Sequence, residues 1–62
     1  MPWYIVHEID VDQDVHSATV HTSRAAFDSR RRALDYARLS VADAVEVTDP
    51  QGNTIYPEEA MP

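Results

Sequence analysis

The side chains best suited to chemistry lie in the first third of the chain, where aspartates recur at every second position. Asp10-x-Asp12-x-Asp14 has the spacing with which an EF-hand calcium loop begins. That loop requires Gly at its sixth position and a bidentate Glu at its twelfth, where this chain has Val15 and His21. We therefore expect no EF-hand and no metal site; a weak surface cation site is the alternative that the spacing leaves open.

The three histidines do not form a pattern typical of a zinc site. His16 and His21 stand five residues apart, so on a strand their side chains point to opposite faces. His7 falls in an apolar row with Ile5 and Ile9, where a partly buried, hydrogen-bonded histidine is the commoner outcome. We expect none of the three to bind zinc.

Nucleophilic catalysis needs a serine or cysteine beside a base that a third group orients. The chain has no cysteine, and its serines, Ser17, Ser23, Ser29 and Ser40, stand in no such motif. With a single Gly, it also has no glycine-rich loop that could hold a phosphate. A chain of 62 residues has little room for a water-excluding pocket. We expect no enzyme activity and no cofactor.

Charge is the strongest compositional signal. Five Arg stand against eleven Asp and Glu, which gives a net charge of −6 and an isoelectric point near 4.6. Such a balance argues against a general nucleic-acid binder and favours a partner with a basic surface. Residues 1–23 carry four acids and no Arg, whereas residues 24–38 carry every Arg and two Asp.

The arginines gather where a helix is expected to begin. Cations near the positive end of a helix dipole cost about 0.3–1 kcal/mol, so Arg30-Arg31-Arg32 breaks a local rule. One interpretation is an anion-binding surface made by Arg24, Arg30, Arg31, Arg32 and Arg38. The other is that these side chains pair with the protein's own surplus acids.

Length and hydropathy predict one small domain that spans residues 1–62. The start, Met1-Pro2-Trp3-Tyr4, lacks the basic residues and apolar run of a signal peptide, and no apolar stretch approaches the roughly 20 residues of a membrane helix. We therefore expect a cytoplasmic protein with no membrane contact. Because a chain of this length has a small core, we expect either a monomer or a homodimer, and the sequence leaves both open.

The periodicity predicts two hairpins separated by a helix. Strands are expected at about 3–11 and 15–22, joined by a turn at Asp12-Gln13-Asp14, and again at 44–48 and 54–56. The turn Asp49-Pro50-Gln51-Gly52-Asn53 joins the second pair, and residues 58–62 are expected to fray.

A helix is expected at about 29–40, because apolar residues there recur with helical spacing. Asp28 or Ser29 would cap its start. Its buried stripe would consist of Ala33, Leu34, Ala37 and Val41. The predicted fold is α+β: a ββαββ chain whose four-stranded, mainly antiparallel sheet carries one helix on one face.

One helix covers only one face of such a sheet, so the other face is a candidate contact surface. The larger apolar row of the first strand, Trp3, Ile5 and Ile9, is expected to face the helix together with Val45 and Val47. The open face would then display Val6 among polar side chains. The predicted partner-binding surface, a partial DNA mimic, comprises Tyr4, Glu8, Asp10, Asp12, Asp14 and Glu46. The alternative is that these side chains are only solvated.

The order of these pieces resembles a family of short prokaryotic and phage ββαββ domains. The resemblance rests on the strand pair, on Phe27-Asp28-Ser29 leading into the helix, and on Val45-Glu46-Val47 followed by the glycine turn. Size and acidity also make the chain similar to phage-encoded anti-CRISPR proteins, especially those that inhibit type I-C systems.

That resemblance implies an inhibitor inside the host cell that binds a basic surface of a CRISPR effector complex and obstructs target DNA binding or cleavage. It implies no catalysis and carries over no functional residue, because no residue motif defines the class. The Arg-rich helix departs from a pure DNA mimic. The alternatives are a small regulator that contacts nucleic acid through this helix, and an antitoxin-like module that completes another protein's sheet at an unpaired edge.

Overall fold

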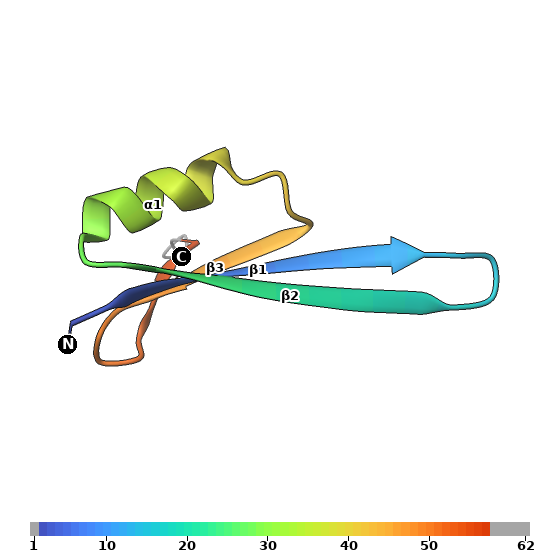
Figure 1. Cartoon of the computed structure of the whole chain (residues 1–62), viewed down its shortest axis with the longest axis horizontal. Coiled ribbons are helices and arrows are strands. Elements are labelled where there is room, and N and C mark those ends of the chain that lie inside the picture. Colours follow the sequence, from blue (N-terminus) through green and yellow to red (C-terminus); the bar gives the residue numbers. More distant parts are fainter. Residues whose placement is uncertain (1, 58–62) are drawn as a thin grey trace, which may run out of the picture.

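The computed structural model describes residues 2–57, which form a four-stranded antiparallel sheet with one helix on one face (Figure 1). The elements are β1 (Tyr4–Gln13), β2 (Ala18–Phe27), α1 (Arg30–Leu39), β3 (Ala44–Thr48) and β4 (Thr54–Tyr56). The strand order is β2-β1-β3-β4, and every neighbouring pair is antiparallel. The predicted α+β, ββαββ class is confirmed. The expected fraying of residues 58–62 lies outside the described residues.

Helix α1 begins and ends close to the predicted positions. Ser29 caps its start, where its hydroxyl accepts a hydrogen bond from the backbone N–H of Arg32 at 3.4 Å. Ala33 and Ala37 are buried and Leu34 is half-buried, as the stripe predicts. Val41 is the exception, because it lies beyond the last helical turn and is fully exposed.

The second hairpin matches its prediction in both strands. The Asp49 carboxylate accepts hydrogen bonds from the backbone N–H groups of Gln51 at 3.0 Å and Asn53 at 2.8 Å. Gly52 has a φ of 88°, which an L side chain rarely adopts, so this position requires glycine. A register shift between Val47 and Thr48 bends β4 away from the rest of β3.

The first hairpin turns later than predicted. The Asp14 backbone N–H donates to the Ser17 carbonyl at 2.7 Å, and the Asp14 carboxylate accepts from the Val15 N–H at 2.7 Å. The turn therefore follows residue 13, and β2 occupies residues 18–27 in place of the expected 15–22. Small and polar residues 23–26 continue the strand because they pair with residues 5–8 of β1.

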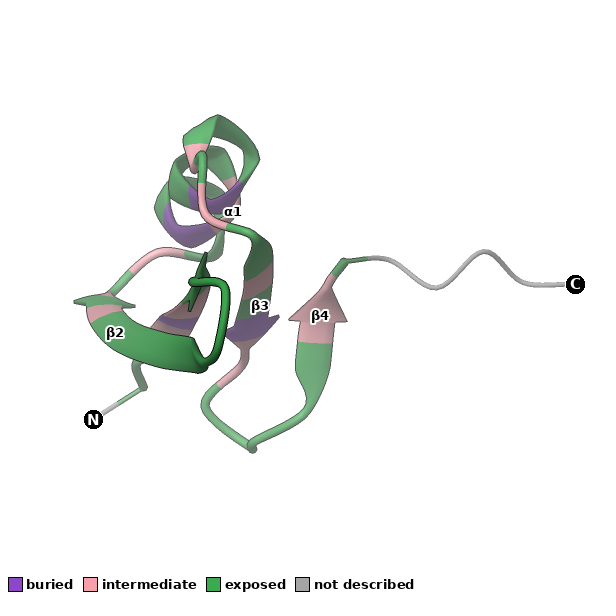
Figure 2. Cartoon of the chain, turned by 90° about the vertical axis from the view of Figure 1, so that its right-hand side faces the viewer, coloured by how far each residue is buried: buried purple, intermediate pink, exposed green. Residues whose placement is uncertain are grey.

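In the core, the side chains of β1 that face the helix belong to the even-numbered row. The prediction had put the odd-numbered row there. Val6 and Val47 are partners across β1 and β3, and both are fully buried against Ala33 and Ala37. Side chains alternate along a strand, so the even-numbered residues of β1 face α1 and the odd-numbered ones face away. The predicted positions of Ile5 and Ile9 under the helix are therefore wrong, and Trp3, predicted to lie there too, is 42% exposed. Figure 2 shows the buried segments on α1 and on the strands beneath it.

Beyond the helix, β1 and β2 continue as a two-stranded projection. β3 pairs only with Ile5–Ile9 of β1, whereas the pairing of β1 with β2 continues to Gln13. We name residues 10–21 the hairpin arm; every residue in it is exposed. It extends well past α1 and β3 (Figure 1), and the outer edge of β2 has no neighbouring strand among residues 2–57.

Candidate functional site

The predicted acidic face is divided among three places. Tyr4 and Glu8 lie on the side of the sheet that α1 covers, and Glu46 lies on the opposite side. Asp10, Asp12 and Asp14 lie on the hairpin arm. A single open surface that contains all six residues does not form, because the true register turns the even row of β1 toward the helix.

Glu8 holds the C-terminal part of α1 to β1. The Tyr36 hydroxyl donates to its Oε1 at 2.7 Å, and the Ser40 hydroxyl donates to its Oε2 at 2.8 Å. These two hydrogen bonds, chiefly the one from Tyr36, lower the pKa of Glu8. The same bond to Glu8 raises the pKa of Tyr36. Glu8 therefore has a structural task and is not a free contact residue.

Sequence reasoning did not identify this arrangement, although a signal for it exists. Tyr36 and Ser40 stand four residues apart and thus share one side of the helix end. Two hydroxyls in that position can satisfy a carboxylate on the strand below. The signal becomes readable only once Glu8 is known to face the helix.

Tyr4 also has a structural role and is not a free contact residue. It is half-buried at the edge of the core and lies opposite Phe27 across β1 and β2. The Phe27 ring in turn packs against Tyr36, with centroids 5.2 Å apart and planes tilted by 48°. This aromatic group packs the middle of α1 against β1 and β2.

Glu46 lies on the side of the sheet away from α1, in a row that crosses three strands. Its partner on β1 is His7, and the partner of His7 on β2 is Arg24. Glu46 accepts a hydrogen bond from the Thr54 hydroxyl at 2.7 Å, and His7 Nε2 lies 3.2 Å from the Thr48 hydroxyl. This row carries one acid and one Arg, so it is not an acidic surface.

The part of the predicted acidic surface that the structure leaves exposed lies on the hairpin arm. Asp10 and Asp12 lie on one face of β1, about 6.6 Å apart at the usual rise of a strand. Asp14 follows in the turn, and all three side chains are exposed. The Nε2 atom of the His21 imidazole lies 3.9 Å from the Asp12 carboxylate.

A fourth carboxylate, which the sequence reasoning missed, lies at the base of the arm. The Asp43 side chain accepts a hydrogen bond from the Val11 backbone N–H at 2.6 Å. It thereby caps the edge of β1 just beside the point where β3 begins. Asp43 precedes β3 by one residue, and nothing in the local pattern indicates that it reaches β1.

The five arginines of the predicted anion-binding surface do not lie together either. Arg24 lies on β2, away from the other four. Arg31 and Arg38 share the Asp35 carboxylate, at 4.0 Å and 3.8 Å. Arg30 and Arg32 form no ion pair with another residue in the range 2–57. Pairing with the protein's own acids thus accounts for part of the cluster and leaves two exposed cations at the start of α1.

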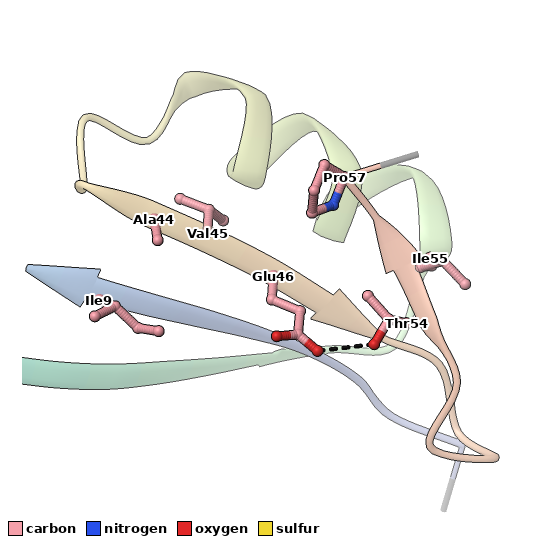
Figure 3. Close-up of a pocket in the computed structure, with 7 residues that line it drawn as sticks. All are labelled: Ile9, Ala44, Val45, Glu46, Thr54, Ile55 and Pro57. Atoms are coloured by element: carbon pink, nitrogen blue, oxygen red, sulfur yellow. Dashed lines mark hydrogen bonds between the residues drawn. The ribbon is translucent and has the colours of Figure 1, made fainter. Parts of the chain in front are cut away.

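An open groove runs beside β3 where β4 bends away (Figure 3). It has a volume of about 800 Å³. The described residues that line it are Ile9, Ala44, Val45, Glu46, Thr54, Ile55 and Pro57. Glu46 is the one titratable side chain among them, and it is hydrogen-bonded to Thr54. The lining therefore offers mostly apolar contact, with one hydroxyl–carboxylate pair, Thr54 and Glu46.

Across residues 2–57, no three His, Asp or Glu side chains come close enough together to hold a metal ion. No helix in the same range is long and apolar enough to cross a membrane.

Comparison of the chain with family models, curated proteins and solved structures gives no match. The resemblance to anti-CRISPR proteins therefore stays a prediction.

Proposed function

We propose that this chain is a non-catalytic binding protein whose hairpin arm contacts a basic surface of another protein. The observation that carries the proposal is the position of Asp10, Asp12 and Asp14 on a projection that α1 and β3 do not cover. An arm of this shape can enter a groove that a flat sheet face cannot. Its charge suits a groove lined by Lys and Arg.

The arm acids are available for binding because the fold makes little use of them. The Asp10 side chain accepts no hydrogen bond from residues 2–57, and that of Asp14 accepts one, from the adjacent Val15. The net charge of −6 adds a long-range attraction to a basic partner and speeds the encounter. Both terms weaken as salt is added.

We further propose that the partner is a CRISPR effector complex and that binding obstructs its access to target DNA. The support is the resemblance in size, acidity and order of elements to small anti-CRISPR proteins. Duplex DNA carries a charge about every 1.7 Å, whereas carboxylates on one strand face stand about 6.6 Å apart. The arm would therefore compete for a limited basic patch, and not for a whole DNA channel.

The test is plasmid interference in cells that carry a type I-C CRISPR system aimed at the plasmid. Cells that express the chain are expected to keep the plasmid, and cells without it are expected to lose it. The variant D10N/D12N/D14N should fail to protect, because it removes the arm charge. Asn at position 14 still offers an oxygen to the Val15 N–H.

The matched control is D28N/E58Q/E59Q, which removes the same number of acids elsewhere in the chain. It is expected to protect as the native chain does. Protection by the arm variant equal to that of the control would contradict the role of the arm. Loss of the plasmid with the native chain would contradict the choice of partner.

A second candidate function rests on the start of α1. Arg30 and Arg32 are exposed, and the single acid on the helix, Asp35, already pairs with Arg31 and Arg38. This local excess of positive charge could hold a nucleic-acid backbone despite the acidity of the whole chain. A mobility-shift assay at low salt tests it with duplex and single strands. Binding that R30Q/R32Q abolishes supports this function, and no shift with the native chain excludes it.

A further inference from the structure

The side of the sheet away from α1 carries both apolar and polar side chains, and no element among residues 2–57 covers it. We name it the open face; it carries the odd-numbered residues of β1 and their partners on β2 and β3. Ile5 and Ile9 are half-buried there, while Val11 and Val20, which pair with each other, are 41% and 59% exposed. His7 separates Ile5 from Ile9, so these side chains form two apolar patches along the sheet, one on each side of the row of His7 and its partners.

The covered side is a small core for such a chain. Its buried residues within the described range are Val6, Val47, Ala33 and Ala37, two of which are alanines. Burial of apolar surface is the main stabilising term in folding, and the open face holds side chains as large as those in the core. Covering this face would therefore add substantially to what holds the chain together.

Charge decides what can cover the open face. Glu8, Asp10 and Asp12 belong to the even row of β1 and lie on the opposite side of the sheet. On the open face the positive charge of Arg24 balances the negative charge of Glu46, with His7 between them. A strongly basic partner is drawn to the arm and gains nothing from this neutral surface. A second acidic copy can approach through it without meeting a net negative charge.

The row Arg24–His7–Glu46 is also complementary to itself. A two-fold axis that lies in the interface along β1 exchanges the β2 side of one sheet with the β3 side of the other. Arg24 of each copy then lies over Glu46 of the partner copy, while Ile5 and Ile9 each meet their own equivalents. Figure 3 shows Ile9 and Glu46 projecting from the same side of the sheet, away from α1.

We propose that the open face is the interface of a homodimer with this symmetry. At about 3.3 Å per residue and about 4.8 Å between strands, the face measures roughly 30 by 15 Å. The face thus covers roughly 450 Å² on each copy and about 900 Å² in total, which is the size of a weak, reversible interface. The dimer does not depend on the proposed function, because it leaves both acidic arms with their Asp rows turned outward.

The test is sedimentation velocity on the full chain from about 1 to about 500 μM, where a dimer of moderate affinity dissociates. The native chain is expected to shift from monomer to dimer within this range. R24E and E46R should each weaken the dimer by about 100-fold, because each variant places like charges opposite one another. The double variant R24E/E46R should restore it to within about threefold of the native chain.

The two single variants separate this pairing from a general charge effect. R24E makes the chain more acidic and E46R makes it less acidic, so simple repulsion would weaken one dimer and strengthen the other. R38E, on the outer side of α1, changes the net charge by as much as R24E and should leave the dimer nearly unchanged. Melting curves verify that each variant is folded.

Three results would overturn the proposal. The native chain could stay monomeric throughout the range, R24E and R38E could act alike, or the double variant could fail to recover. If the native chain stays monomeric and R24E abolishes binding to a different protein, the face belongs to that protein and not to a second copy.

Discussion

The two ends of the first hairpin differ in what covers them. At the end under α1, the even row of β1 supplies Tyr4, Val6 and Glu8, which pack against the core or bond to the helix. Two residues further on, the same row supplies Asp10 and Asp12, which are exposed. The alternation is continuous, but α1 and β3 stop near residue 9. The cover, and not the strand pattern, determines whether an acid stabilises the fold or remains available for binding.

The largest effect is expected from removing a core valine. Val6→Ala deletes two methyl groups from a fully buried site and should lower the free energy of unfolding by about 2–3 kcal/mol. Val20→Ala deletes the same atoms on the arm, where the side chain is 59% exposed, and should cost at most about 0.5 kcal/mol. Urea denaturation of both variants measures the difference.

These two variants test directly whether the covered end of the first hairpin and its arm differ in what they contribute to stability. Equal losses at the two positions would show that the arm contributes to the core as much as the covered end does. If the loss for Val20→Ala grows with protein concentration, the valine is buried in the proposed dimer and not within the monomer.

A smaller effect, with a characteristic pH dependence, is expected from Glu8→Gln. The pKa of Glu8 is lowered in the folded chain by the hydrogen bonds from Tyr36 and Ser40. Its contribution is therefore present above the ordinary carboxyl pKa of about 4.3 and is lost as the pH falls through the lowered value. Glu8→Gln should melt at a lower temperature than the native chain at pH 7, and this gap should narrow at pH 3.

Asp10→Asn is the matched control, since Asp10 lies two residues further along the same face of β1. Its melting temperature should follow that of the native chain at both pH values. If Asp10→Asn lowers the melting temperature at pH 7 as Glu8→Gln does, Asp10 also stabilises the fold. The proposed difference between Glu8 and the arm acids would then be wrong.

The smallest effect is expected from Asp35→Asn on the exposed side of α1. The pairs of Asp35 with Arg31 and Arg38 are long and solvent-exposed, so their joint loss should cost under about 1 kcal/mol. The difference from the native chain should vanish in about 1 M salt, where the Debye length falls to about 3 Å. A difference that survives high salt would show that Asp35 acts through something other than its charge.

Local signals were sufficient to predict α1 and the second hairpin, but not the bounds of β2. The glycine turn fixed the second hairpin because Asp49 and Gly52 meet the demands of that turn within five residues. Ser29 and the alanine stripe placed α1 for the same reason. These features depend on interactions between near neighbours, which a sequence displays directly.

The faces of β1 could not be predicted in this way. Both rows of that strand hold apolar residues, and the larger ones, Ile5 and Ile9, lie on the open face. What decides is the pairing of Val6 with Val47, forty-one positions apart, under two alanines small enough to let the helix approach. The same register assigns Glu8 to the helix and, of the acids predicted to form the contact surface, leaves those of the arm exposed and away from the helix. The error in the site therefore followed from the error in the faces.

The most direct test of the account is the affinity of the chain for a purified type I-C effector complex at low and at high salt. We expect affinity to fall steeply with salt for the native chain and for D28N/E58Q/E59Q. D10N/D12N/D14N should bind weakly at low salt and lose little more at high salt, while melting like the native chain. Native-like affinity and salt dependence in this arm variant would contradict the claim that the hairpin arm makes the contact.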